Sequence, residues 1–175
     1  MKRIALLCMT VCLFSVAVQA QVLATRNGKI SFASPSDDDV KAVNNQVTSR
    51  LTTATGQMTF SVLMKGFKFE LAEMQDHFNG KDYANTTAYP RADFSGMITN
   101  VKAINFTKDG TYSATVKGNL TMHGVTKSVT VTGNVIVAGG KVTVKASFPL
   151  SLADYNINGK GVSSKVNVEV SCKYD

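Results

Sequence analysis

The chain has 175 residues, of which 44% are hydrophobic and 18% are charged. This composition excludes a disordered polyelectrolyte and a protein with many membrane spans, and the length fits one folded domain. The whole chain contains two histidines and no tryptophan, which argues against a His-rich metal site and therefore against a metalloenzyme.

The N-terminus has the pattern of a secretory signal peptide. Lys2 and Arg3 form a positive region, residues 4–18 are a mainly apolar run, and residues 18–20 place small residues at the spacing that signal peptidase accepts. The apolar run is shorter than the ~20 residues that a membrane-spanning helix needs. We therefore expect a signal peptide over residues 1–20, a mature chain that begins at Gln21, no membrane span, and a periplasmic or secreted location.

The cysteines and the charge balance exclude further kinds of partner. Leu7 precedes Cys8 and Val11 precedes Cys12, where a lipoprotein signal has a small residue, so no lipid anchor is expected. Cleavage removes two basic residues, which lowers the net charge from +7 to about +5, and leaves Cys172 without a disulfide partner. The lysines are scattered and lack interleaved aromatic residues, so we expect no nucleic-acid partner.

Alternation of apolar and polar residues, typical of half-buried strands, begins early in the chain. Ile30 and Phe32 fit a first strand, residues 43–53 a second, and residues 56–64 a third. The acidic run Asp37–Asp39 between the first two is expected to be a solvated loop and not a metal site, because three adjacent carboxylates cannot all face one ion.

One segment breaks this period of two. Between residues 69 and 79 the apolar side chains of Leu71, Met74 and Phe78 recur at helical spacing, and a glycine follows where a helix would end. We predict one short helix here, between the third strand and a fourth strand at residues 92–98.

Four long alternating strands fill the C-terminal half, at residues 111–122, 129–137, 141–152 and 166–172. Short turn signals lie before or between them, at residues 109–110, 123–124, 139–140 and 158–161. Connections this short require antiparallel neighbours. The eight strands predict an all-β fold, and we favour an eight-stranded antiparallel barrel over a sandwich because closure removes exposed strand edges.

The apolar faces of the strands would meet inside this barrel. Eight strands enclose either a packed core or one small ligand, and small inward residues such as Ala114, Gly118, Gly133 and Ala146 favour an apolar cavity. Alternation alone leaves open the alternative that aromatic rings fill the space. The candidate lipid-pocket residues, taken from the inward rows, are Phe60, Val62, Met64, Phe94, Ile98, Tyr112, Ala114, Val116, Val131, Val135, Val144, Ala146, Phe148 and Val168.

The inward positions of the clearly alternating strands carry no carboxylate, histidine or lysine. These positions therefore offer no side chain for acid–base catalysis. His77, on the predicted helix, and His123, in a tight turn before Gly124, are interpreted as packing or conformational residues. Cys172 falls on an inward row and is interpreted as a small core residue. We expect no catalytic residue, no metal and no cofactor, and therefore not an enzyme.

Three segments resemble the YceI-like family. Residues 118–129 (GNLTMHGVTKSV) closely resemble that family's strand–turn–strand signature, residues 89–94 (YPRADF) resemble its entry to a strand, and residues 148–157, with their Asp-Tyr pair, resemble a late segment. The match runs in the same order from Thr25 to the C-terminus.

The resemblance implies a lipocalin-like barrel domain over residues 21–175 that holds a long-chain isoprenoid or fatty-acyl lipid in its interior, without catalysis. Residues 34–56 are longer and more polar than the family's usual first hairpin, so ligand entry and ligand length can differ. No head-group motif of the family is matched here, and Lys65, Arg91 and Lys127 are candidates from their charge alone.

Other interpretations fit the same pattern. A small outer-membrane barrel shares the strand number and the alternation, but it needs an outward apolar face and aromatic girdles, and this chain has five tyrosines and no tryptophan. A packed β scaffold without a ligand would follow if rings fill the centre. An enzyme acting on a bound lipid would need groups that the inward rows lack. The sequence leaves open whether a homodimer seals the barrel mouth.

Overall fold

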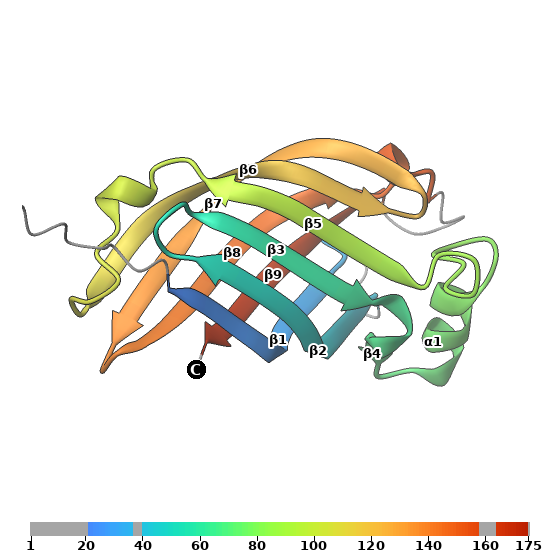
Figure 1. Cartoon of the computed structure of the whole chain (residues 1–175). Helices are drawn as coiled ribbons and strands as arrows, with labels where there is room; N and C mark the ends of the chain where they lie inside the picture. The colour runs from blue at the N-terminus through green and yellow to red at the C-terminus, as the bar shows by residue number, and fades with distance from the viewer. Residues whose placement is uncertain (1–20, 37–39, 158–163, 175) are drawn as a thin grey trace, which may run out of the picture.

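The computed structural model describes residues 21–36, 40–157 and 164–174 (Figure 1). The predicted signal peptide (residues 1–20), the acidic run (residues 37–39) and the predicted turn at residues 158–161 lie outside the described residues and stay predictions. None of the helices within the described ranges is long and apolar enough to cross a membrane.

The strands form one antiparallel sheet that closes on itself. Neighbours follow the order β1-β9-β8-β7-β6-β5-β3-β2, β2 pairs again with β1, and the short β4 is added beside the start of β2. The prediction of an all-β, eight-stranded antiparallel, lipocalin-like barrel with one short helix is therefore confirmed. In chain order the elements are β1 (Val22–Ala33), β2 (Lys41–Thr52), β3 (Gln57–Leu63), η1 (Met64–Gly66), β4 (Lys68–Phe69), α1 (Ala72–Asn79), β5 (Arg91–Ile98), η2 (Val101–Ala103), β6 (Gly110–Met122), β7 (Val125–Ala138), β8 (Lys141–Ser151), η3 (Ala153–Tyr155) and β9 (Lys165–Tyr174).

The helix is shorter than the pattern that predicted it. Residues 68–69 are extended and pair with the start of β2, so α1 begins only at Ala72. Leu71, one of the three apolar positions that predicted the helix, precedes it and is 48% exposed. Backbone pairing with β2 satisfies the hydrogen-bonding groups of residues 68–69, which explains why they are a strand and not a first helical turn.

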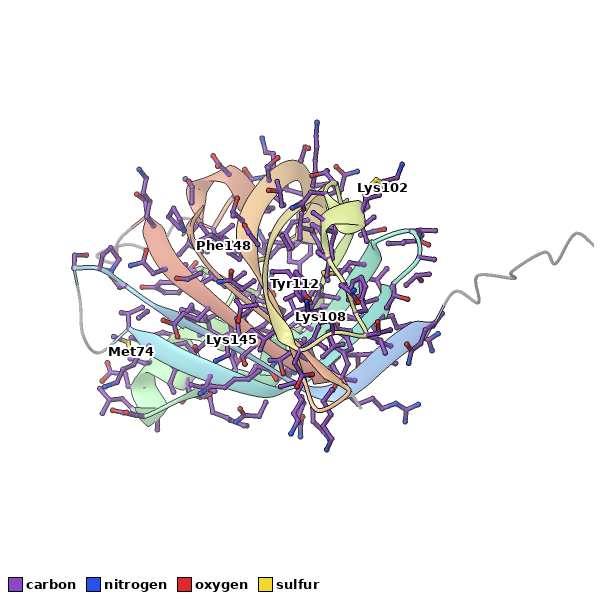
Figure 2. The ribbon with its side chains drawn as sticks, turned by 90° about the vertical axis from the view of Figure 1, so that its left-hand side faces the viewer. Met74, Lys102, Lys108, Tyr112, Lys145 and Phe148 are labelled. Atoms are coloured by element: carbon purple, nitrogen blue, oxygen red, sulfur yellow. The ribbon has the colours of Figure 1, made fainter. Side chains whose placement is uncertain are left out.

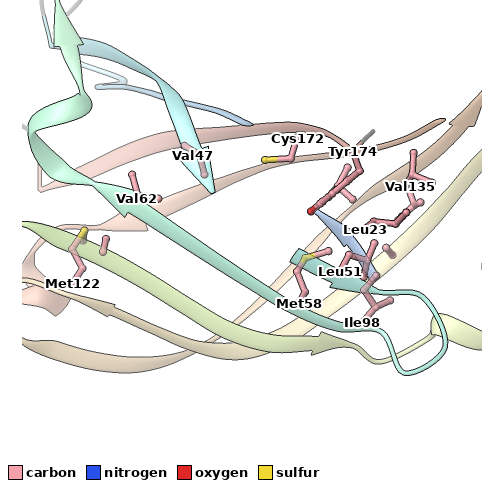
Figure 3. Packing of buried hydrophobic residues seen from close by; sticks show 14 of the residues in the cluster. Leu23, Val47, Leu51, Met58, Val62, Ile98, Met122, Val135, Cys172 and Tyr174 are labelled. Carbon is pink, nitrogen blue, oxygen red and sulfur yellow. The ribbon is translucent and has the colours of Figure 1, made fainter. Parts of the chain in front are cut away.

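One end of the barrel is filled. Because neighbouring strands run in opposite directions, β1, β3, β6 and β8 begin at this end and β2, β5, β7 and β9 finish there (left in Figure 1). Large side chains from these strand ends pack together, and each is at most 8% exposed. Figure 3 shows six of them, which we call the closed-end plug: Leu23, Leu51, Met58, Ile98, Val135 and Tyr174.

A buried hydrogen bond lies within the plug. The hydroxyls of Ser49 on β2 and Tyr174 on β9 are 2.7 Å apart, and both residues are 1% exposed. β1 and β9 pair only between residues 29–33 and 167–171, so the closed-end part of their junction has no backbone ladder. In that part Gly28 of β1 lies directly against the buried Cys172 side chain of β9, since a Cβ on Gly28 would lie 2.5 Å from the Cys172 Sγ.

The opposite, open end is covered by α1 and by the segment that leads from it to β5 (right in Figure 1). Four rings meet beneath α1, with neighbouring centroids 5.1–5.9 Å apart. Phe67 is buried, and the other three are only partly buried. We call Phe32, Phe67, Phe69 and Phe78 the four-ring cluster.

The Ser49–Tyr174 hydrogen bond yields a test of the plug. Tyr174→Phe leaves the Ser49 hydroxyl buried without its partner, so the free energy of unfolding should fall by about 1–3 kcal/mol. Adding Ser49→Ala should cost less than the sum of the two single changes, because no polar group is then left unpaired. Urea unfolding of the four proteins measures this, and additive effects would contradict the hydrogen bond.

Candidate functional site

An apolar cavity runs from the open end to the plug. Its volume is about 230 Å³, far above the ~10–15 Å³ that a cavity needs to hold one water. Among the described residues that line it, those with nitrogen or oxygen atoms in the side chain are His77 and Tyr83, both at the open end. These described walls therefore offer space to an apolar group and almost no hydrogen bonds to a polar one.

Ten of the fourteen candidate pocket residues lie on the cavity wall, and that they contact a lipid stays a prediction. They are Phe60, Val62, Met64, Phe94, Val116, Val131, Val144, Ala146, Phe148 and Val168.

The other four candidates do not line the cavity. Ile98, Ala114 and Val135 are at most 3% exposed, because they lie near the strand ends where the plug packs. Tyr112 comes from the start of β6, and its hydroxyl donates a hydrogen bond to the carbonyl oxygen of Lys108 at 2.9 Å. Figure 2 views the barrel from the closed end and shows Tyr112 near the middle, whereas Lys102 lies at the edge of this end. These side chains form the floor of the site and not its walls.

The sequence pattern missed most of the open end of the cavity. The four-ring cluster, Met74 and His77 all contribute to the lining, and the break in alternation at residues 69–79 was the one signal for them. A break in a strand pattern marks where the chain leaves the sheet, but it does not say what the departing segment covers.

The small inward residues do not all leave empty space. A Cβ on Gly118 would lie 2.5 Å from the Ser95 carbonyl oxygen and 2.6 Å from the Phe94 ring. This glycine therefore permits a close approach of β5 and β6, and the Phe94 ring covers it from inside. Phe94 and Phe60 pack edge to face at 6.2 Å on the wall. The rings line the cavity without filling it.

The three candidate head-group cations lie in different surroundings. Arg91 donates to the Ser61 hydroxyl and lies 3.4 Å from a carboxylate oxygen of Asp93, so its charge is paired on the outer face. Lys65 is exposed in η1. Lys127 is exposed and lies opposite Leu120, on the row that runs inward to the cavity. Of the three, Lys127 is the cation that continues the cavity wall toward the open end.

The turn that contains His123 is held from two sides. His123 has a left-handed φ of 51°, its Nδ1 donates to the Tyr155 carbonyl oxygen at 3.0 Å, and its ring packs on Tyr89 at 4.2 Å between centroids. The contacts tie η3 and the segment before β5 to the β6–β7 turn. They give His123 a structural role at the rim.

In the described ranges no group of three or more His, Cys, Asp or Glu side chains could hold a metal ion. Burial raises the pKa of Cys172 to about 11, although a backbone hydrogen bond from Lys29 opposes the shift. A thiol with that pKa is protonated at neutral pH and is a poor nucleophile. Burial likewise raises the pKa of Tyr174.

Comparison with known sequences identifies relatives. The profile of the YceI-like domain matches residues 20–174. A UPF0312 protein of Pseudomonas putida is 35% identical over 100 residues, which cover 54% of this chain and 48% of that protein. The chain thus spans about half the length of the curated relatives it matches.

Solved structures share the fold. A polyisoprenoid binding domain from Saccharophagus degradans, implicated in plant cell wall breakdown, has a TM-score of 0.75 at 14% identity and covers 90% of this chain and 99% of its own. BcnA from Burkholderia cenocepacia has a TM-score of 0.69 at 18% identity, over 85% and 96% of the two chains. At these identities the likeness shows the fold alone.

The raised pKa values predict a loss of stability at alkaline pH. The Cys172 thiol ionises near pH 9 when unfolded and near 11 when folded. Over this window the unfolded chain holds fewer protons, so the free energy of unfolding falls as pH rises, and below pH 9 the thiol has no effect. When the free energy of unfolding is measured in urea at a series of pH values, Cys172→Ala should remove the decline that begins at pH 9. The further decline that begins near pH 10, which comes from Tyr174, should remain. Equal slopes in the variant and the parent would contradict this assignment.

Proposed function

The chain belongs to the YceI-like family, and from this premise we propose that it is a non-catalytic binding protein for a long-chain amphiphile. The ligand is of the polyisoprenoid or fatty-acyl type, and its chain lies in the apolar cavity. The name of the Saccharophagus degradans neighbour, a polyisoprenoid binding domain, supports the isoprenoid alternative by fold likeness.

The apolar cavity is the observation that carries the proposal. Each methylene that leaves water contributes about 0.8 kcal/mol, so about ten of them contribute about 8 kcal/mol. Ordering of the ligand and of the protein opposes part of this gain, and a net 8.2 kcal/mol would correspond to a Kd of about 1 μM. Micromolar binding without any polar contact inside therefore needs a chain that buries more than about ten methylenes, so that the gain exceeds the ordering cost by about 8.2 kcal/mol.

The polar end of such a ligand belongs at the rim. A buried charge without a partner is strongly disfavoured, and none of the described residues on the deep cavity wall has a polar side chain. Lys127 lies on the inward row at the open end, where its ammonium group would meet a carboxylate or phosphate head group. The proposal therefore favours an anionic amphiphile.

The geometry favours this function over the two alternatives from the sequence. An outer-membrane barrel turns its apolar rows toward lipid, whereas the apolar rows here line an internal cavity. A packed scaffold needs a filled centre, whereas an apolar cavity of about 230 Å³ lies between the plug and the open end here. The expected signal peptide supports a periplasmic or secreted protein. A homodimer that seals the rim stays a prediction, and gel filtration at several concentrations would test it.

Extraction of bound lipid tests the proposal directly. Protein secreted from its producing cells and purified without detergent should yield, on organic extraction and mass spectrometry, an amphiphile with a long apolar chain and an anionic head group. N-terminal sequencing of the same sample should start at Gln21. Protein that yields no amphiphile and takes up neither prenyl nor acyl probes would overturn the function, and a ligand with a neutral head group would overturn the role of Lys127.

The depth of the cavity predicts a dependence on chain length. Val116 lines the deep end of the cavity, beside Ile98 of the plug. Val116→Phe should shorten the cavity from its floor, so affinity for hexadecanoic acid should fall at least tenfold while affinity for octanoic acid changes little. Lys117→Phe, which places the same ring on the exposed outer face, is the matched control. Displacement of a fluorescent fatty acid measures both, and an equal loss for both chain lengths would contradict the placement.

A further inference from the structure

Strands β7 and β8 pair over only part of their length. Backbone pairing begins beside the hairpin turn, at Ala138 and Lys141, and stops at Gly133 and Ala146. Beyond that rung β7 is still paired with β6, and β8 with β9. The facing edges, residues 125–132 and 147–151, are therefore not paired with each other. Five residues of strand span roughly 15 Å, and we call this part of the wall the β7–β8 slit.

Two residues explain why the ladder ends there. A Cβ on Gly133 would lie 2.4 Å from the carbonyl oxygen of Lys145, so only glycine allows the close crossing of the strands at the last rung. Pro149 has no backbone N–H and donates nothing to a ladder, although it remains opposite Asn167 of β9. The sequence thus draws the two strands together at one point and weakens their pairing beyond it.

The slit leads from the surface into the cavity. Val129 and Val131 on one edge, and Phe148 and Leu150 on the other, line the cavity and are only half-buried. On the outer face a polar depression begins at the same rung, where Thr132 and Ser147 are exposed. Ala146 and Val170 line both the cavity and the depression. The wall between interior and solvent is therefore thin at this point.

The other incompletely paired junctions are sealed. Between β2 and β3 the Asn44 amide donates to the Leu63 carbonyl oxygen at 2.9 Å, and β4 adds to the start of β2. Across the β1–β9 gap, Gly28 packs against the buried Cys172 side chain, since a Cβ on Gly28 would lie 2.5 Å from the Cys172 Sγ. The slit ends at η3 on the open-end side. The hydrogen bond from His123 to the Tyr155 carbonyl oxygen holds η3 against the β6–β7 turn.

We infer that the long apolar chain of the ligand enters and leaves sideways, through the β7–β8 slit, and this rests on the proposed function. Parting the slit breaks none of the backbone pairs that the structure describes between β7 and β8, whereas parting the ladders at the other junctions breaks several. Passage along the barrel axis would have to displace the packed rings of the four-ring cluster. Sideways entry lets the chain slide in while its head group stays in water beside Lys127.

A reversible bridge across the slit tests this inference. Thr130→Cys with Pro149→Cys places two cysteines on the facing edges, in a chain in which Cys8 and Cys12 are serine. Cys172 is buried and its pKa is raised to about 11, so it does not exchange. The matched control is Asn134→Cys with Lys145→Cys, which bridges the same strands at a rung that is already paired. Stopped-flow uptake of cis-parinaric acid, a fluorescent long-chain fatty acid, gives the rate.

The oxidised slit bridge should slow both uptake and release at least tenfold, with Kd unchanged because the cavity is intact. Reduction should restore both rates, and the control bridge should change neither. Uptake at the parental rate through a bridged slit would overturn the inference and leave the proposed function standing. A parental protein that binds no fatty acid or prenyl probe at all would overturn the proposed function itself.

Hydrogen exchange keeps the inference testable if the bridge does not form. Some amides of β7 point toward β8. In the empty protein, those within residues 125–132 should exchange much faster than those within residues 133–138, because only residues 133–138 are paired with β8. Equal protection in the two halves of β7 would show a sealed wall and overturn sideways entry.

Discussion

The strict two-residue period of the strands, imposed on a closed sheet, is the constraint on which the rest of this molecule depends. Closure leaves one interior, so every second side chain from eight strands must share it. What that interior can do is then decided by side-chain volume at each level along the axis. Leu51, Met58 and Tyr174 fill the level where the strand ends converge, and each is at most 1% exposed. Farther along, Val131 and Ala146 leave the centre empty. Plug and cavity are thus two outcomes of one pattern.

The plug makes an empty cavity tolerable. An unfilled interior costs dispersion contacts, and about 230 Å³ of it must be offset by packing elsewhere. The closed end supplies that packing and adds the buried Ser49–Tyr174 hydrogen bond, which fixes β2 against β9 where they lack a shared ladder. At the other end the rim is held by His123, which joins the β6–β7 turn to η3 and to Tyr89. A bound chain would complete the core that the sequence leaves unfinished.

The sequence predicted what depends on period and missed what depends on register and on segments outside the sheet. Alternation along β6, β7, β8 and β9 was long enough to identify the strands, their antiparallel neighbours and the barrel. It could not distinguish Val116, on the wall, from Ala114, in the floor, because both lie on one inward row and only the convergence of strand ends separates them. The four-ring cluster was missed because its members come from a strand, from the β3–α1 segment and from α1, and no linear pattern joins them. The small size of Gly118 predicts empty space beside it, whereas the Phe94 ring covers this glycine in the structure.

A barrel that binds a long chain faces two opposed requirements. Closure protects strand edges from pairing with other chains, yet a fully paired wall leaves a chain no route inside except past the rings at the rim. The β7–β8 slit is a compromise between the two. Its edges carry devices that natural proteins use to blunt exposed strands: Pro149 on one edge lacks a donor, and Lys127 on the other places a charge at the open end. The two edges also belong to strands whose other sides are fully engaged, with β6 and β9, so the gap is narrow and bounded. These features disfavour the addition of a strand from another protein to either edge. They do not hinder a flexible lipid chain, because such a chain forms no backbone hydrogen bonds with the strands between which it passes.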